Sequence, residues 1–336
     1  IYTGGTIGMD AGENGLTASS NFSEKFFRAF PEYKKKFTPQ NSVEATSDID
    51  FDFIEYQVPV DSSHADLQFA VKIYHCIYDR SDDIDRWLVL MGSDTLPYIA
   101  ACLGYLFHQS TLPIIVSGAM KPLTEPNSDA ILNVRFALEN LQLNPLQGVH
   151  VVFGGQLLSA VRCTKLYANR ADAIVDTTAE NTSPIPRRFL NVNTPKQKND
   201  FTDFDIRVIR VAPSMHTRFV RNALAGCPDA VLIQCYGSGT APAENSEFAQ
   251  AIKELKRKEV PLFAISQTMD AWVDFSIYAA SAWLSELDIV RCGDMNLEAA
   301  YTKLWYLLNH DFSGSRLSEA MQLNLCGEIS QQIDVE

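Results

Sequence analysis

Short aliphatic runs alternate along most of this chain with stretches of helical periodicity, and this alternation constrains the fold more than any other feature. The runs predicted to be strands are residues 87–90, 112–116, 149–153, 230–233 and 260–265. They are almost continuously apolar, as parallel strands buried on both faces must be. The stretches predicted to be helices are 96–108, 128–141, 247–258 and 297–308. Strand, polar turn and helix in repetition predict an α/β fold with parallel sheets flanked by helices.

The chain length favours two domains. One hydrophobic core rarely serves 336 residues. A polar region with three prolines, at about 183–205, interrupts the alternation and is typical of a linker. We therefore expect a larger N-terminal α/β domain over 1–184, a linker over 185–206 and a smaller C-terminal α/β domain over 207–336.

The formal net charge of −13 argues against several classes of partner. Such a surface repels phosphate backbones and anionic membranes, so we expect neither nucleic acid nor a membrane. The 7 cysteines are odd in number and widely spaced, which predicts free thiols in a reducing, cytoplasmic compartment. Neither these cysteines nor the 6 histidines have the spacing of metal ligands, so no metal is expected. The chain starts at Ile1 in what resembles the end of a strand, so we expect residues to precede it.

The polar turns after the predicted strands are the place to look for a site, because ligands of open parallel sheets bind beyond the carboxyl ends of the strands. Residues 3–8 read Thr-Gly-Gly-Thr-Ile-Gly. The glycines let the backbone turn sharply, which presents the hydroxyl of Thr6 as a candidate nucleophile. The alternative is a phosphate or dinucleotide loop, but the spacing fits neither known pattern and no lysine follows.

Residues 92–95, Gly-Ser-Asp-Thr, directly follow the predicted strand 87–90. A serine hydroxyl beside a carboxylate, here Ser93 and Asp94, can relay protons or act as a nucleophile. The alternative is that these side chains cap the next helix. Lys165 can accept a proton from such a hydroxyl if it is removed from water, although a lone lysine is ordinarily a surface residue.

Two further segments are weaker signals. Asp61 and Ser62, in the sequence Asp-Ser-Ser, can hold the charged ends of a zwitterion, or they can form an ordinary turn. Ala119 lies in a Ser-Gly-Ala-Met turn after the strand 112–116. This turn can bring backbone groups close to a ligand, or it can be an ordinary strand-to-helix loop.

Taken together, these segments resemble the bacterial-type L-asparaginases, most closely their cytoplasmic type I branch. The matching stretches are 2–9, 61–63, 92–95, Lys165, 236–239, 293–295 and 325–328, in an order and spacing that agree over essentially the whole chain. The resemblance implies a large N-terminal and a smaller C-terminal α/β domain. It also implies hydrolysis of L-asparagine to L-aspartate and ammonia without a cofactor, in a homodimer or homotetramer with the site at a subunit contact.

The resemblance also implies a role for each matching residue. Thr6 forms a β-acyl-enzyme, a Ser93-Asp94-Lys165 group relays protons, and the backbone of Ala119 contacts the reacting amide. Ser62 and Asp94 bind the substrate's α-carboxylate and α-amino groups. The implied catalytic residues are Thr6, Ser93, Asp94 and Lys165, and the implied substrate-binding residues are Asp61, Ser62, Gly92, Ser93, Asp94 and Ala119.

Several positions depart from the pattern of the family. Ser93 stands where a threonine is usual, which frees rotation about χ1. Leu16 stands where a lid tyrosine is usual, and Gln234 where allosteric members carry an effector-binding arginine. Further departures are His64, Thr240 and residues 159–161. The alternatives that stay open are a slow enzyme, one with altered amide specificity, and an inactive homologue that binds an amino acid.

Overall fold

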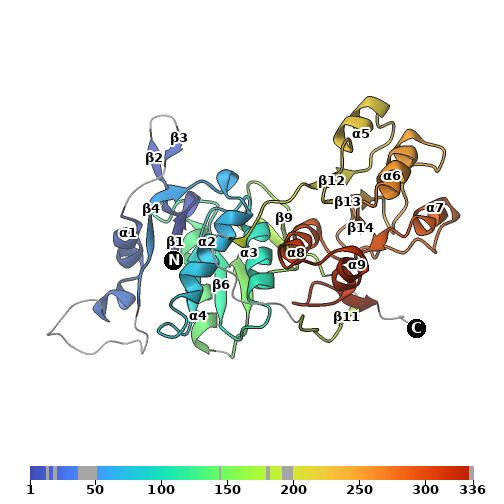
Figure 1. Cartoon of the computed structure of the whole chain (residues 1–336). Helices are drawn as coiled ribbons and strands as arrows, with labels where there is room; N and C mark the ends of the chain where they lie inside the picture. The colour runs from blue at the N-terminus through green and yellow to red at the C-terminus, as the bar shows by residue number, and fades with distance from the viewer. Residues whose placement is uncertain are drawn as a thin grey trace. The chain divides into compact units, whose positions relative to one another are not determined.

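The computed structural model describes residues 1–12, 15–17, 21–36, 51–143, 145–178, 182–190 and 200–332. The chain divides into two compact units, Ile1–Val175 and Asp176–Glu336 (Figure 1). The expected domain limits at 184 and 206 stay a prediction. Residues 191–199 of the expected linker lie outside the described residues, as do Glu13 and Asn14 of the expected lid.

The first unit is built on a six-stranded sheet with the strand order β4-β1-β5-β6-β7-β8. The strands are β1 (Tyr2–Gly4), β4 (Glu55–Val60), β5 (Trp87–Leu90), β6 (Ile114–Ser117), β7 (Val149–Phe153) and β8 (Gln156–Ser159). All neighbours up to β7 pair in parallel, but β8 pairs with β7 antiparallel. Gly154 and Gly155 join these two strands with φ of 58° and 72°. A Gly-Gly pair with both φ positive suits a tight hairpin, so the predicted parallel sheet ends in one antiparallel edge strand.

Helices cover this sheet. They are α1 (Phe22–Ala29), α2 (Leu67–Tyr78), α3 (Leu96–Leu106) and α4 (Asp129–Leu143), with short 3-10 turns at Thr6–Gly8, Pro31–Lys36 and Ser62–His64. The helix α3 packs on α2 and on β6 and β7, while α4 packs on β5, β6 and β7. Two small strand pairs complete the unit: β2 (Asp10–Gly12) with β3 (Gly15–Thr17), and β9 (Cys163–Lys165) with β10 (Ile174–Asp176).

The second unit repeats the α/β pattern on a smaller sheet. Its strands β12 (Ile206–Arg210), β13 (Ala230–Cys235), β14 (Leu262–Ser266) and β15 (Val290–Arg291) are parallel and lie in sequence order. Its helices are α5 (Thr217–Ala223), α6 (Glu247–Arg257), α7 (Ala282–Glu286), α8 (Leu297–Asn309) and α9 (Gly314–Gln322), with a 3-10 turn at Ala279–Ser281. A separate antiparallel pair joins β11 (Thr182–Pro184) to β16 (Ser330–Gln332).

The predicted strands and helices are confirmed, with end positions that differ by no more than two residues. For example, the strand predicted over 112–116 is observed at Ile114–Ser117, and the helix predicted over 96–108 ends at Leu106. Such differences are ordinary, because element ends fray and their last hydrogen bonds are weak. The sheet of the second unit is buried throughout β13 and β14, as continuous apolar runs predict.

The last described segment of the second unit is anchored by a buried ion pair. Lys303 Nζ lies 2.7 Å from Glu328 Oε1, and both side chains are fully buried. Burial opposes ionisation of Glu328, but the charge of Lys303 and the hydrogen bonds donated by Lys303 and by the amides of Cys326 and Leu325 outweigh it. The pKa of Glu328 is therefore lowered from its ordinary value.

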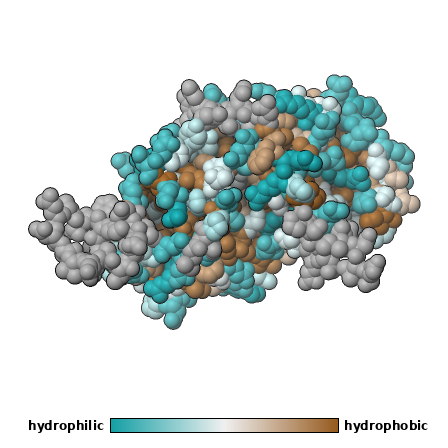
Figure 2. Space-filling model, turned by 90° about the horizontal axis from the view of Figure 1, so that it is seen from below, coloured by the Kyte–Doolittle hydropathy of each residue, from teal (hydrophilic) through white to brown (hydrophobic). Residues whose placement is uncertain are grey.

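The surface shown in Figure 2 intersperses hydrophilic with hydrophobic residues. Across the described ranges, no helix is both long and apolar enough to cross a membrane. Three large apolar side chains of the second unit are more than half exposed: Phe219, Ile277 and Tyr278.

Candidate functional site

Turns that follow β1, β4 and β5 meet at the carboxyl edge of the first sheet. Gly5 has a φ of 82°, and a Cβ at this position would collide with the backbone N and Cα of Gly92. A Cβ at Gly92 would in turn lie 2.6 Å from Ser62 Oγ. Backbone therefore packs directly on backbone here, which only glycine permits. Thr6 follows this contact immediately, so its turn lies against the turn that carries Ser93.

A lysine and a hydroxyl–carboxylate pair form the centre of the cluster. Lys165 Nζ donates to Ser93 Oγ at 2.9 Å and to Asp94 Oδ1 at 2.6 Å. The lysine is the last residue of β9, and its side chain is 17 % exposed, whereas that of Asp94 is 63 % exposed. The surface position that is ordinary for a lone lysine is thus not what is found. A shielded cation bonded to a hydroxyl is an arrangement that can move a proton.

Ser62 joins the cluster from the turn after β4. Its hydroxyl lies 3.5 Å from Asp94 Oδ2 and accepts the Asp94 amide at 3.3 Å. Thr95 Oγ1 donates to the carbonyl of Ser62 at 2.8 Å and makes no capping bond to α3. The alternative that residues 93–95 serve as a helix cap is therefore wrong for Thr95, whose side chain binds the neighbouring turn instead.

Thr6 begins the 3-10 turn Thr6–Gly8 and is half-buried. The next residue, Ile7, is fully buried and its carbonyl accepts the amide of Leu123, which fixes the turn to the rest of the unit. None of the described residues forms a hydrogen bond with the Thr6 side chain. Thr6 thus reaches the cluster through the glycine contact of its backbone rather than through its hydroxyl.

The turn after β6 completes this edge of the sheet. Ala119 is fully buried, and Met120 Sδ accepts the hydroxyl of Ser93 at 3.6 Å. Two residues of α4 hold this turn and were not identified from the sequence: Asp129 and Asn133. The sequence signal was a Ser-Asp pair at the start of a helix, which is equally typical of a simple cap.

Asp61 differs from the other predicted site residues. Its Oδ1 accepts the amide and the hydroxyl of Ser63 at 2.9 and 2.8 Å, and the residue is exposed. The hydrogen bond from the Ser63 amide, followed by that from its hydroxyl, lowers the pKa of Asp61. This carboxylate shapes its own turn, and its predicted role in substrate binding stays a prediction. Leu16, in the hairpin strand β3, is 44 % exposed.

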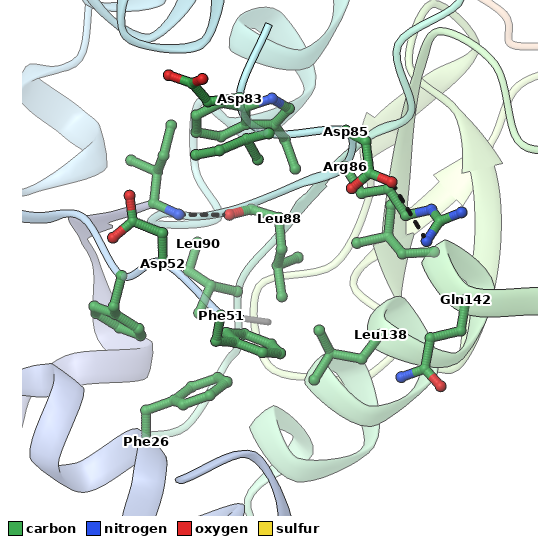
Figure 3. Close-up of a pocket in the computed structure, with 15 residues that line it drawn as sticks. Phe26, Phe51, Asp52, Asp83, Asp85, Arg86, Leu88, Leu90, Leu138 and Gln142 are labelled. Atoms are coloured by element: carbon green, nitrogen blue, oxygen red, sulfur yellow. Dashed lines mark hydrogen bonds and ion pairs between the residues drawn. The ribbon is translucent and has the colours of Figure 1, made fainter. Parts of the chain in front are cut away.

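A cavity of about 490 Å³ lies at the opposite, amino edge of the same sheet (Figure 3). Phe26, Leu88 and Leu138 are among its apolar lining residues, and the amino group of Ile1 donates to the carbonyl of Leu88 at 2.7 Å. Ligands of parallel sheets bind at the carboxyl edge, so this cavity is not the candidate site. In the described part of the chain, no cluster of three or more His, Cys, Asp or Glu could hold a metal ion.

Comparison with protein families gives two matches. The family model described as "Asparaginase, N-terminal" matches residues 1–197. The model described as "Glutaminase/Asparaginase C-terminal domain" matches residues 205–321. Together they span both units.

Among curated proteins, the chain is 29 % identical to L-asparaginase 1 of Escherichia coli over 98 % of this chain and 96 % of that protein. It is 26 % identical to an L-asparaginase of Thermococcus kodakarensis over 81 % and 84 %. It is also 25 % identical to a glutamyl-tRNA(Gln) amidotransferase polypeptide of Methanococcus maripaludis, over 74 % of this chain and 63 % of that one.

Solved structures agree on the fold. L-asparaginase I from Vibrio cholerae superposes with a TM-score of 0.77 at 26 % identity, covering 98 % of this chain and 97 % of that one. The L-asparaginase from Thermococcus kodakarensis gives a TM-score of 0.79 at 23 % identity, with the same coverage.

Proposed function

The chain belongs to the asparaginase family, and from this premise we propose that it hydrolyses L-asparagine to L-aspartate and ammonia, with Thr6 as the nucleophile. The observation that carries the proposal is the Lys165–Ser93–Asp94 cluster, packed through the Gly5–Gly92 contact against the turn that presents Thr6. A hydroxyl nucleophile, a shielded lysine and a second hydroxyl are the parts that acyl transfer needs.

The proposed reaction has two halves. In the first, Thr6 Oγ attacks the side-chain amide carbon of asparagine, and the tetrahedral intermediate collapses when its nitrogen leaves as ammonia. In the second, water attacks the resulting ester, which releases L-aspartate and restores Thr6. The Ser93 hydroxyl, bonded to Lys165, supplies the proton to the leaving nitrogen and regains one from the attacking water.

The two ends of the substrate fit different members of the cluster. In this proposal the carboxylate of Asp94, which is largely exposed, pairs with the substrate's α-ammonium group. The hydroxyl of Ser62 donates to its α-carboxylate, with Asp61 and Gly92 at the margin of the same pocket. The backbone of Ala119 contacts the reacting amide. No cofactor takes part.

An ammonia-release assay with the purified protein tests the proposal. We expect release from L-asparagine at millimolar concentration, and we expect Thr6→Ala to lower kcat by about 10⁴-fold or more while the fold is kept, because the nucleophile is lost. Thr6→Ser keeps a hydroxyl and serves as the control that retains measurable turnover. Unchanged turnover in Thr6→Ala would move the nucleophile elsewhere, with Ser93 as the next candidate.

A second candidate function is an amino-acid-binding homologue with little turnover or with altered amide specificity. Leu16 and Ser93 favour it, since the first lacks a hydroxyl at the lid position and the second lacks the γ-methyl group. Absence of ammonia release from both asparagine and glutamine, together with calorimetric binding of L-aspartate, would select this function. If the two departures merely slow an enzyme, Ser93→Thr combined with Leu16→Tyr raises kcat.

The remaining expectations concern the setting of the protein. We propose a homodimer or homotetramer that works in the cytoplasm on a small-molecule substrate, without a nucleic-acid or membrane partner. Light scattering of the purified protein decides the first point, with an expected particle of two or four times the chain mass.

A further inference from the structure

Asp129 and Asn133 form a buried polar pair beside the candidate site. They lie one helical turn apart on the same face of α4, and their exposed fractions are 8 % and 0 %. Their side chains bind the loop that follows β6, and through it they bear on the Lys165 cluster.

The contacts of this pair span the whole loop 118–121. The Asp129 carboxylate accepts the amide of Met120 at 2.8 Å and the amide of Lys121 at 3.0 Å. Asn133 Nδ2 donates to the carbonyl of Gly118 at 3.0 Å and to Asp129 Oδ2 at 3.4 Å. The backbone is therefore held on both sides of Ala119, and the two side chains also hold each other.

Asn133 occupies its buried position at a cost. Its Oδ1 is buried without a hydrogen-bond partner among the described residues. A buried acceptor left unpaired lowers stability, so an apolar side chain would suit the packing of α4 better. The two bonds that Nδ2 donates are what an amide provides here and an apolar side chain does not.

The loop is linked to the proposed chemistry through Met120. The Met120 amide is held by Asp129, and its sulfur accepts the hydroxyl of Ser93. The same hydroxyl accepts a hydrogen bond from Lys165. Asp129 thus sets the position of a group that orients the Ser93 proton, and it acts through that group rather than on the reacting atoms.

We propose that Asp129 and Asn133 are positioning residues for amide hydrolysis, which hold the loop 118–121 so that the Ala119 backbone and the Met120 sulfur stay fixed beside Ser93. The inference rests on the function proposed above. Misplacement of a supporting group by about 1 Å can cost about 100-fold in rate, so a loosened loop lowers kcat. The α-groups of the substrate bind other residues, so KM changes little.

The kinetic test uses Asp129→Asn, Asp129→Ala and Asn133→Ala, assayed with L-asparagine well below each unfolding temperature. We expect kcat to fall by about tenfold or more, with KM within about threefold of the wild-type value. Asp129→Asn loses less than Asp129→Ala, because one side-chain oxygen remains as an acceptor. Two matched controls lie on the same helix: exposed Glu139→Gln, and Asn140→Ala, whose amide binds the Phe136 carbonyl of α4. Both retain the wild-type kcat.

Hydrogen exchange separates the two proposals. We expect a peptide covering 118–123 to exchange faster in Asp129→Asn, while peptides from β6 and from the middle of α4 keep their protection. Unchanged exchange in the loop overturns the inference, and so does faster exchange with an unchanged kcat. If the wild-type protein releases no ammonia, the proposed function fails, and the exchange data still decide whether Asp129 holds the loop.

Discussion

Lys165 is the last residue of the short strand β9, and its ammonium group binds both Ser93 and Asp94. The contact joins residues 71 and 72 positions apart, so local sequence cannot reveal it. Most of the side chain is shielded from water, and the electrostatic effect of its charge on a neighbouring hydroxyl is larger there than at an open surface.

We expect Lys165→Met to lower kcat for L-asparagine by about 10²–10⁴-fold, which is the usual contribution of a positioned proton-transfer group. Methionine keeps most of the chain length and removes only the charge and the donors. Lys72→Met, on an exposed face of α2, is the matched control and keeps the wild-type rate. A Lys165→Met enzyme that retains more than about half of the wild-type kcat contradicts the proposed relay.

At the scale of elements, the site depends on how closely strand-end turns approach one another. The turns after β1 and β5 touch backbone to backbone at Gly5 and Gly92. Neither turn has a fixed conformation of its own. Their separation is set by β1 and β5, which pair as neighbours in the sheet.

Gly92→Ala tests this contact. The added methyl group would lie 2.6 Å from Ser62 Oγ, so we expect that side chain to be displaced and kcat/KM for asparagine to fall by about 100-fold. Gly104→Ala, inside α3, places the same methyl group 3.2 Å from a Val161 side-chain carbon, which can shift by a few tenths of an ångström. This control keeps nearly full activity. Equal losses in the two variants would indicate general destabilisation rather than a disturbed site.

At the scale of the whole molecule, each unit has its own buried core and its own reason to be stable. In the second unit, the C-terminal segment returns from α9 to pair β16 with β11, and the Lys303–Glu328 ion pair is buried within the same unit. Removing one member of a fully buried pair leaves the other charge without a partner, which is more damaging than losing an exposed pair.

We expect Glu328→Gln to lower the free energy of unfolding by about 3–5 kcal/mol at pH 7, measured by urea denaturation. The control is Glu254→Gln, which breaks the exposed Lys258–Glu254 pair and changes stability little. The double variant Lys303→Met with Glu328→Leu removes both charges and recovers much of the loss. If the single and double variants are equally unstable, the ion pair is not the cause.

The pH dependence of the same pair has a defined sign. Folding lowers the pKa of Glu328, so its contribution is present above the unfolded value of about 4.3 and is lost as the pH falls through the folded pKa. The wild-type protein therefore loses stability on acidification partly through Glu328. The Glu328→Gln variant has a shallower decline below a pH of about 4.3, and an identical decline in both proteins would contradict this assignment.

The sequence by itself determined the class of the fold and many of its elements. Continuous aliphatic runs and helical periodicity are local patterns, so the strands β5, β6, β7, β13 and β14 and the helices α3, α4, α6 and α8 were placed within two residues. The motif residues Thr6, Ser93 and Lys165 were also identified, because glycine turns and neighbouring hydroxyl and carboxylate groups are visible in short windows. The Gly-Gly hairpin into β8 was local too, yet the expectation of parallel strands overrode it.

Only the tertiary structure decided which of these groups meet. It brought Lys165 to Ser93, turned Thr95 towards Ser62 instead of its own helix, and left Asp61 to its own turn. It also placed Asp129 and Asn133 against the loop that carries Ala119. The physical reason is that the order of strands in the sheet sets these distances. That order is fixed by the packing of residues far apart in the chain, which no local pattern encodes.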